Sequence, residues 1–209
     1  PHHERSGLFL YLNTNKRGIT LDITTPTGRE LLLELVRWAD VVIENLGPPR
    51  MAELGLDFAV LQSARPEVVL TSISPFGQSG PYRDYKASDL VSFHMGGYAA
   101  VVGGPVADVN AEPPLKAAEH QAEYVAGVNA AAATMAALLA RMNTGRAQHV
   151  DVSKQESLVP FVFQRIAQIS YQGKIPSRDV VSNPPDGVVA VLPTSDGYVA
   201  ISPREDHLW

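Results

Sequence analysis

The chain has 209 residues, 45% apolar and 19% charged, so it has the composition of an ordinary globular protein long enough to bury a core. Its net charge of −5 argues against a nucleic-acid partner, and no apolar run approaches the ~20 residues that cross a bilayer, so we expect no membrane partner. The sequence contains no cysteine, which excludes disulfides, thiolate metal sites and a cysteine nucleophile and fits a cytoplasmic protein.

The first part of the chain alternates strand-like and helix-like hydrophobic patterns. Thr25-Pro26 is a good helix start, and the apolar residues that follow recur at helical spacing. Short apolar runs before and after helices indicate β-α-β units, which imply a parallel sheet. The expected elements are strands at 19–23, 41–43 (buried) and 68–73 (buried), and helices at 26–39, 48–54 and 58–64.

The second part is dominated by one long helix. It runs from about Glu119 to Met142, is rich in alanine and is apolar almost all round, so we expect it to be buried. Around it we expect a loop at 75–86, a helix at 88–101, a loop at 104–115, an extended segment at 149–152, a helix at 155–171, a linker at 172–187 and a hairpin of 188–192 with 198–202.

These patterns predict an α/β fold: an open parallel sheet with helices on both faces, forming a Rossmann-like large domain. We assign residues 1–172 to this domain, and residues 173–209 to a linker and the start of a small second domain. No dinucleotide fingerprint, phosphate-binding P-loop, zinc-protease motif or nucleophile elbow is present, and we expect no metal site. The loops at strand ends, where open parallel sheets bind ligands, are therefore the candidate site.

Six short blocks carry a family resemblance. They are 13–22 (NTNKRGITLD), 25–29 (TPTGR), 39–45 (ADVVIEN), 74–82 (SPFGQSGPY), 144–153 (TGRAQHVDVS) and 196–199 (DGYV). In this order they resemble the family III CoA-transferases, or CaiB/BaiF family, which include formyl-CoA transferase and carnitine CoA-transferase. Members of that family are longer, so the resemblance implies a chain truncated at both ends. It also implies a homodimer of two interlocked chains, and therefore large exposed apolar patches on this piece.

The resemblance implies an enzyme that moves CoA between an acyl-CoA and a carboxylic acid, with the CoA thioester as substrate and no permanently bound cofactor. A carboxylate attacks the thioester to form a mixed anhydride, an incoming acid displaces the acyl group, and CoA is rebuilt on the new acid. The family nucleophile is an aspartate four residues before a glycine, and Glu123, four residues before Gly127, stands at that position. The longer side chain moves the carboxylate by ~1 Å or more, a displacement that can cost about a hundredfold in rate.

Other residues complete the candidate site. Asp89 matches an acidic residue near the nucleophile, although it could equally be a helix N-cap beside Ser88. Glu119, one turn before Glu123, is the second candidate for the nucleophile, and His120, three residues before Glu123, could tune Glu123. By resemblance CoA binds at Leu21, Asp22, Ile23, Thr24, Asn45, Leu46, Gly47 and Lys86. Residues 45–48 end a strand and open a helix, a geometry that presents free N–H groups.

Plainer roles and rival functions remain open. Glu123 could simply favour the helix dipole, and Lys86 and Arg50 could be solvated surface charges. One basic CoA-contacting position of the family is Glu53 here. Ser88 replaces the histidine base of the related acyl-CoA racemases, which argues against racemisation. The alternatives are a CoA-thioester-binding protein of the same fold with lost or altered catalysis, and a nucleotide-binding α/β domain of another kind.

Overall fold

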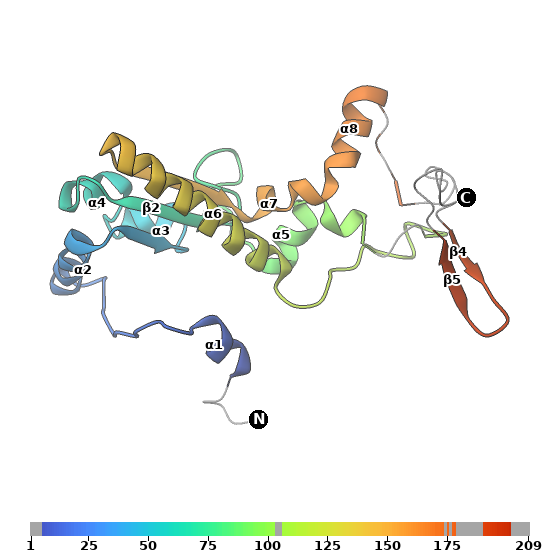
Figure 1. The fold of residues 1–209 in the computed structure, drawn as a ribbon, viewed down its shortest axis with the longest axis horizontal. Helices are drawn as coiled ribbons and strands as arrows, with labels where there is room; N and C mark the ends of the chain where they lie inside the picture. Colours follow the sequence, from blue (N-terminus) through green and yellow to red (C-terminus); the bar gives the residue numbers. More distant parts are fainter. Residues whose placement is uncertain (1–5, 103–105, 174, 176, 179–189, 202–209) are drawn as a thin grey trace.

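The computed structural model describes residues 6–102, 106–173, 175, 177–178 and 190–201. The helices are α1 (Gly7–Leu12), α2 (Pro26–Trp38), α3 (Pro48–Glu53), α4 (Phe58–Ala64), α5 (Asp89–Met95), α6 (Gln121–Thr144), α7 (Lys154–Ser157) and α8 (Phe163–Gln172), with the 3-10 helices η1 (Tyr98–Ala100) and η2 (Val159–Val162) (Figure 1). The strands are β1 (Val41–Glu44), β2 (Val69–Ser74), β3 (Gln148–Ser153), β4 (Ala190–Pro193) and β5 (Tyr198–Ile201).

Within the described residues, β1, β2 and β3 form a parallel sheet in that order. Val41 is opposite Val69 in the register of β1 and β2, and Ser74 is opposite Ser153 in that of β2 and β3. The carboxyl ends of the three strands therefore meet at one edge of the sheet. The predicted parallel sheet is confirmed.

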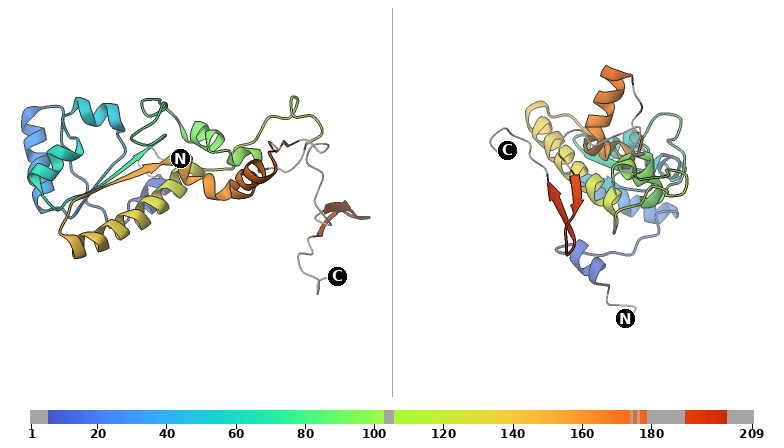
Figure 2. Two further views of the ribbon diagram at one scale, coloured as in Figure 1. Left: turned by 90° about the horizontal axis from the view of Figure 1, so that it is seen from above. Right: turned by 90° about the vertical axis from the view of Figure 1, so that its right-hand side faces the viewer.

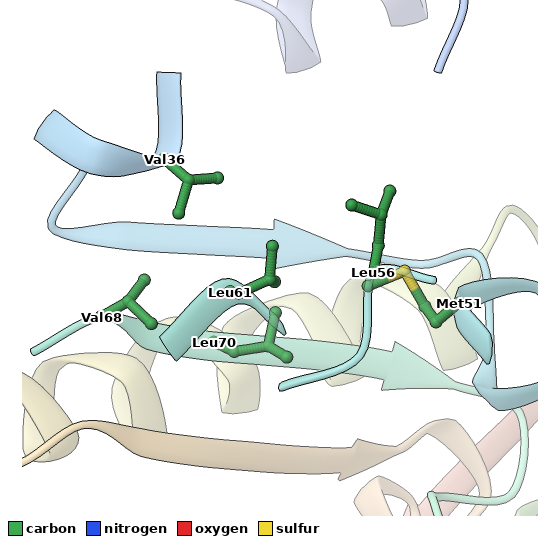
Figure 3. Packing of buried hydrophobic residues seen from close by; sticks show 6 residues of the cluster. All are labelled: Val36, Met51, Leu56, Leu61, Val68 and Leu70. Atoms are coloured by element: carbon green, nitrogen blue, oxygen red, sulfur yellow. The ribbon is translucent and has the colours of Figure 1, made fainter. Parts of the chain in front are cut away.

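One face of the sheet is covered by α2, α3 and α4. Thr25 starts α2, because its hydroxyl accepts a hydrogen bond from the Gly28 N–H at 3.1 Å and Pro26 takes the first helical position, as predicted. The core on this face is built from apolar side chains of these helices, of the connection between α3 and α4, and of β2 with the residue before it: Val36, Met51, Leu56, Leu61, Val68 and Leu70 (Figure 3).

The opposite face is covered by α6, which packs against β2 and β3 (Figure 2). The buried positions of α6 are Ala122, Ala126, Ala130, Thr134 and Ala137. This near-fourfold spacing follows one stripe of the helix, and alanines there let the helix approach the strands closely. Helices therefore lie on both faces of the sheet, as the sequence predicts.

Three expectations about these elements are wrong. Residues 19–23 form no strand, because Asp22 bonds to Thr24 and turns the chain, and no described strand pairs with this segment. The long helix is not buried all round: only its sheet-facing stripe is covered, and Val128 is 70% exposed. Ile43 is exposed as well, so β1 is not a buried strand.

Glycine and proline break two predicted helices. The expected helix at 88–101 divides into α5 and η1 at Gly96-Gly97, where Gly97 adopts a φ of 77° that favours glycine. The segment 155–171 divides into α7, η2 and α8, with Pro160 in the first turn of η2. The predicted limits of these two helices are therefore wrong.

The membrane expectation also needs a correction. By length and composition alone α6 could span a bilayer, so an apolar run of sufficient length does exist. One such helix is weak evidence for a membrane span, because core helices of soluble proteins pass the same test.

In the C-terminal part, β4 and β5 pair antiparallel, and the Thr194 N–H donates to the Gly197 carbonyl at 2.8 Å. The predicted hairpin is confirmed over residues 190–201. Most of the expected linker at 172–187 lies outside the described residues, and the proposed domain boundary at residue 173 stays a prediction.

Candidate active site

A cavity of about 650 Å³ opens at the carboxyl edge of the sheet. All three parallel strands reach it: Asn45 follows β1, Ile73 is near the end of β2, and Lys154 follows β3. The remaining lining comes from the N-terminal segment and the start of α6: Leu8, Leu12, Lys16, His120, Glu123, Tyr124, Gly127, Val128 and Ala131. The cavity therefore occupies the place where open parallel sheets bind ligands.

Glu123 presents its carboxylate to this cavity from the first turn of α6. Its Oε1 accepts a hydrogen bond from Lys154 Nζ at 3.0 Å, and its side chain remains 47% exposed. The carboxylate is thus held by one cation and remains open to a reactant. Its place in the first turn also favours the helix dipole, so the plainer role is compatible with the same geometry.

Asp89 stands behind Glu123 rather than in the cavity. It is buried at the first position of α5, and its Oδ1 accepts the backbone N–H of Glu123 at 3.1 Å. Its Oδ2 pairs with Lys116 Nζ at 3.0 Å. Ser88, not Asp89, occupies the N-cap position of α5, so the N-cap interpretation is wrong. Asp89 instead satisfies a free N–H at the start of α6 and ties two helices together beneath the site.

The two neighbours of Glu123 have different surroundings. Glu119 precedes α6 and has a left-handed φ of 62°, so it is not one helical turn before Glu123 as expected. It is also not among the residues that line the cavity. His120 lines the cavity at the N-cap position of α6, where its side chain makes no capping hydrogen bond.

The segment from Leu21 to Thr24 forms a tight turn in front of α2. Asp22 Oδ1 accepts hydrogen bonds from Thr24 N at 3.0 Å and Thr24 Oγ1 at 2.6 Å, and these bonds lower the pKa of Asp22. Ile23 packs against the hydrophobic core. None of these residues lines the Glu123 cavity, so any CoA contact with them lies outside that cavity.

The segment after β1 is only partly as expected. Asn45 lines the cavity, but the N–H groups of Leu46 and Gly47 both donate to Glu44 Oε2, at 2.7 and 3.2 Å. The next two positions are prolines, which have no N–H. The expectation of free N–H donors at this helix start is therefore wrong for Leu46 and Gly47. The Glu44 carboxylate already takes the position that an anionic ligand would occupy.

The predicted basic contacts lie outside the cavity. Lys86 is exposed on the loop before α5. Arg50 pairs with Glu53 at 2.8 Å, and both side chains are exposed, which matches the role of a solvated surface charge. A CoA-binding role for Lys86 stays a prediction.

Lys154 is a site residue that was not predicted from the sequence. The available signal was its position directly after a predicted extended segment, since residues at strand ends face the ligand in parallel sheets. His149 was not predicted either, and with Phe58 it lines a second cavity of about 440 Å³. Its Nε2 lies 2.8 Å from Ser72 Oγ, its ring stacks on Phe58 at 5.3 Å, and partial burial lowers the pKa of His149.

Known proteins resemble the chain over its whole length. The model of the family described as CoA-transferase family III matches residues 1–209. A succinate–glutarate CoA-transferase from Agrobacterium fabrum is 32% identical over 194 residues, which cover 93% of this chain and 47% of that enzyme. A formyl-CoA:oxalate CoA-transferase from Streptomyces avermitilis is 38% identical over 151 residues, which cover 72% of this chain and 36% of that enzyme.

A solved structure agrees. The crystal structure of a CaiB/BaiF family protein from Brucella suis superposes with a TM-score of 0.76 at 33% identity, over 91% of this chain and 49% of that one. The chain thus spans about half, or less, of the length of these relatives. A match over all residues, together with a shared fold, shows that the chain belongs to the family III CoA-transferases.

Proposed function

We propose that the protein containing this chain transfers CoA from an acyl-CoA to a carboxylic acid, with Glu123 as the nucleophile. The observation that carries this proposal is the half-exposed Glu123 carboxylate, presented to a cavity at the carboxyl edge of a parallel sheet. Covalent catalysis by a carboxylate needs a group that is both fixed and reachable, and Glu123 meets both conditions.

In the first step, a Glu123 carboxylate oxygen attacks the carbonyl carbon of the thioester. A carbon–oxygen bond forms, the carbon–sulfur bond breaks, and the electron pair leaves on the CoA thiolate. The negative charge passes from the enzyme to the thiolate, and Glu123 is held in a mixed anhydride. No proton has to move, which fits a site built around a carboxylate and an ammonium group rather than a base.

The surroundings of Glu123 support this role. Lys154 restrains one carboxylate oxygen, and Asp89 fixes the backbone N–H, so that the start of α6 is held from two sides. This preorganisation matters because a misplacement of about 1 Å can cost about a hundredfold in rate. A glutamate in this position needs such support more than a shorter aspartate does.

For CoA we propose contacts with residues 21–24, with Asn45, Leu46 and Gly47, and with Lys86, by analogy with the family. The relatives above are named for succinate, glutarate, formyl-CoA and oxalate. For this protein we propose only the class, a carboxylic acid and its CoA thioester, because much of the relatives' length lies outside this chain.

The experiment traps the acylated enzyme. The intact protein is mixed with acyl-CoA and then with hydroxylamine or borohydride, and the labelled peptide is identified by mass spectrometry. We expect the label on Glu123 and its absence in Glu123→Gln, which keeps the shape and removes the nucleophile. Glu123→Asp is the matched variant that keeps the carboxylate. Full activity of Glu123→Ala, or a label elsewhere, would reject the mechanism, and CoA binding without turnover would favour the catalytically lost alternative.

We also propose a homodimer. Large apolar side chains are exposed along α6 and α8, among them Met135, Leu139, Phe163 and Ile169, and faces of this kind mark interaction surfaces. Light scattering of the intact protein should give twice the monomer mass, and a monomeric protein would contradict this. A cytoplasmic location stays a prediction.

A further inference from the structure

Hydrogen bonds hold the chain on both sides of Lys154, and they fix this cation at the site. Ser153, the last residue of β3, caps the short helix that follows, because its hydroxyl accepts the Glu156 N–H at 3.2 Å. On the other side, the Gln155 N–H donates to the Pro75 carbonyl at 3.1 Å, which holds this turn to the end of β2. The Lys154 side chain is 15% exposed, so its stem is packed while its ammonium reaches the cavity.

The proposed chemistry removes the partner of this ammonium group. In the free enzyme, Lys154 Nζ donates to the Glu123 carboxylate at 3.0 Å. When Glu123 carries an acyl group or CoA, its side chain is an anhydride or a thioester and no longer bears a negative charge. Lys154 is then a poorly solvated cation without its counterion, and such a cation is costly unless another anion replaces the lost one.

The other ammonium group that lines the cavity is engaged differently. Lys16 Nζ donates to the Leu12 carbonyl at 2.8 Å and to Asn13 Oδ1 at 3.3 Å, so it supports its own segment of chain. Neither contact involves Glu123. Of the two lysines, Lys154 is therefore the one whose binding capacity appears only after the first step.

We propose that Lys154 exchanges partners during the reaction: it holds Glu123 in the free enzyme and binds the carboxylate of the incoming acid once Glu123 is acylated. This inference rests on the proposed function. The incoming carboxylate oxygen forms a bond to the carbonyl carbon of the derivatised Glu123. From the anhydride, the carbon–oxygen bond to the outgoing acyl group breaks and its electron pair leaves on the outgoing carboxylate; from the thioester, the carbon–sulfur bond breaks and its electron pair leaves on the CoA thiolate. A cation 3.0 Å from Glu123 Oε1 lies within reach of an oxygen that must come within about 3–3.5 Å of that carbon.

The same exchange provides an order of binding. While Glu123 is ionised, its carboxylate occupies Lys154 and repels a second carboxylate. Acylation of Glu123 removes this repulsion and, in the same step, leaves the Lys154 ammonium group able to bind another carboxylate. The acid acceptor should therefore bind the acylated enzyme more tightly than the free enzyme, and Lys154 should affect the KM for the acid more than the KM for acyl-CoA.

The test uses the intact protein with three changes: Lys154→Met, which keeps the length and removes the charge, Lys154→Arg, which keeps the charge, and Arg146→Met, which removes an exposed cation outside the cavity. Two quantities are measured: hydroxylamine labelling of Glu123 with acyl-CoA alone, and the KM values for acyl-CoA and for the acid acceptor.

We expect Lys154→Met to be labelled on Glu123 and to raise the KM for the acid by about tenfold or more, as the loss of one charged hydrogen bond predicts. The KM for acyl-CoA should change much less, Lys154→Arg should recover most of the effect, and Arg146→Met should behave as the parent. An unchanged KM for the acid in a labelled Lys154→Met enzyme would overturn the exchange alone. Absence of a Glu123 label in the parent would instead overturn the proposed function, and the exchange with it.

Discussion

Replacing Thr134 with valine should destabilise the protein more than replacing Thr71 with valine, although the two hydroxyls share one hydrogen bond. Both residues are buried, and their Oγ1 atoms lie 2.6 Å apart between β2 and α6. Thr134 Oγ1 also donates to the Ala130 carbonyl at 2.6 Å. A hydroxyl has one hydrogen, so Thr134 must accept from Thr71.

The magnitude follows from what each change leaves behind. Thr134→Val removes the acceptor and leaves the Thr71 O–H buried without a partner, which costs about 1–3 kcal/mol of the free energy of unfolding. Thr71→Val removes only the donor, while Thr134 still donates to Ala130, so we expect a loss of about 0.5–1.5 kcal/mol. The double variant leaves no orphaned donor and should lose less than the sum of the two single changes.

The assay is urea unfolding of the intact protein and the three variants, followed by circular dichroism and compared through the unfolding midpoints at equal slope. Valine nearly matches threonine in shape, so the comparison isolates the hydroxyls. A loss for Thr71→Val as large as that for Thr134→Val would refute the assigned donor direction. A loss in the double variant equal to the sum of the two single losses would refute the coupling between Thr71 on β2 and Thr134 on α6.

Three further predictions concern the site and its surroundings. Gly28→Ala would place a Cβ 1.8 Å from the Asp22 carbonyl oxygen, so it must displace the 21–24 turn, and calorimetry should show weaker CoA binding and a lower Tm. The Cβ of Gly127→Ala would meet no atom within 4 Å, so this change should stabilise α6 by about 0.5–1 kcal/mol in urea unfolding. Because Gly127 lines the cavity, the added methyl group should also slow CoA transfer. Partial burial lowers the pKa of His149 below its ordinary value of 6.5. The neutral His149 therefore contributes to the free energy of unfolding above that pH, and this contribution is lost as the pH falls. On acidification from about pH 7.5 to about pH 5.5, His149→Gln should lose less of its free energy of unfolding than the parent.

Each of these has a result that would contradict it. Unchanged CoA affinity in a folded Gly28→Ala protein would separate the 21–24 turn from CoA binding. Faster transfer by Gly127→Ala would mean that the cavity is not the reaction site. An equal loss of stability on acidification in His149→Gln and the parent would show that the unfolded chain does not bind this proton more strongly than the folded one.

Local chemistry explains which elements could be predicted from the sequence. The Thr25 cap with Pro26, the helical spacing after it and the short apolar runs at β1 and β2 depend on neighbours within a few residues. The expected strand at 19–23 failed for the opposite reason. A strand needs a neighbouring strand that pairs with its backbone N–H and C=O groups. The alternating pattern of residues 19–23 cannot show whether such a neighbour is present.

Site chemistry was predicted in part. The position of Glu123, four residues before Gly127, is evident from the sequence alone, and Asn45 was also predicted to lie at the site. The partners Lys154 and Asp89 are separated from Glu123 by 31 and 34 positions, and only the folded chain shows that one holds its carboxylate and the other its backbone. The free N–H groups expected after β1 were lost to Glu44, a contact that depends on how the strand end turns.

By itself, the sequence determined the family, the α/β class and the presence of a carboxylate, Glu123, four residues before Gly127, because these depend on residue order and local spacing. Only the tertiary structure decided that the ends of β1, β2 and β3 share one edge, that Lys154 meets Glu123 there, and that a single stripe of α6 is covered. Strand pairing and helix packing decide such contacts through residues far apart along the chain, and no local pattern encodes which of them will meet.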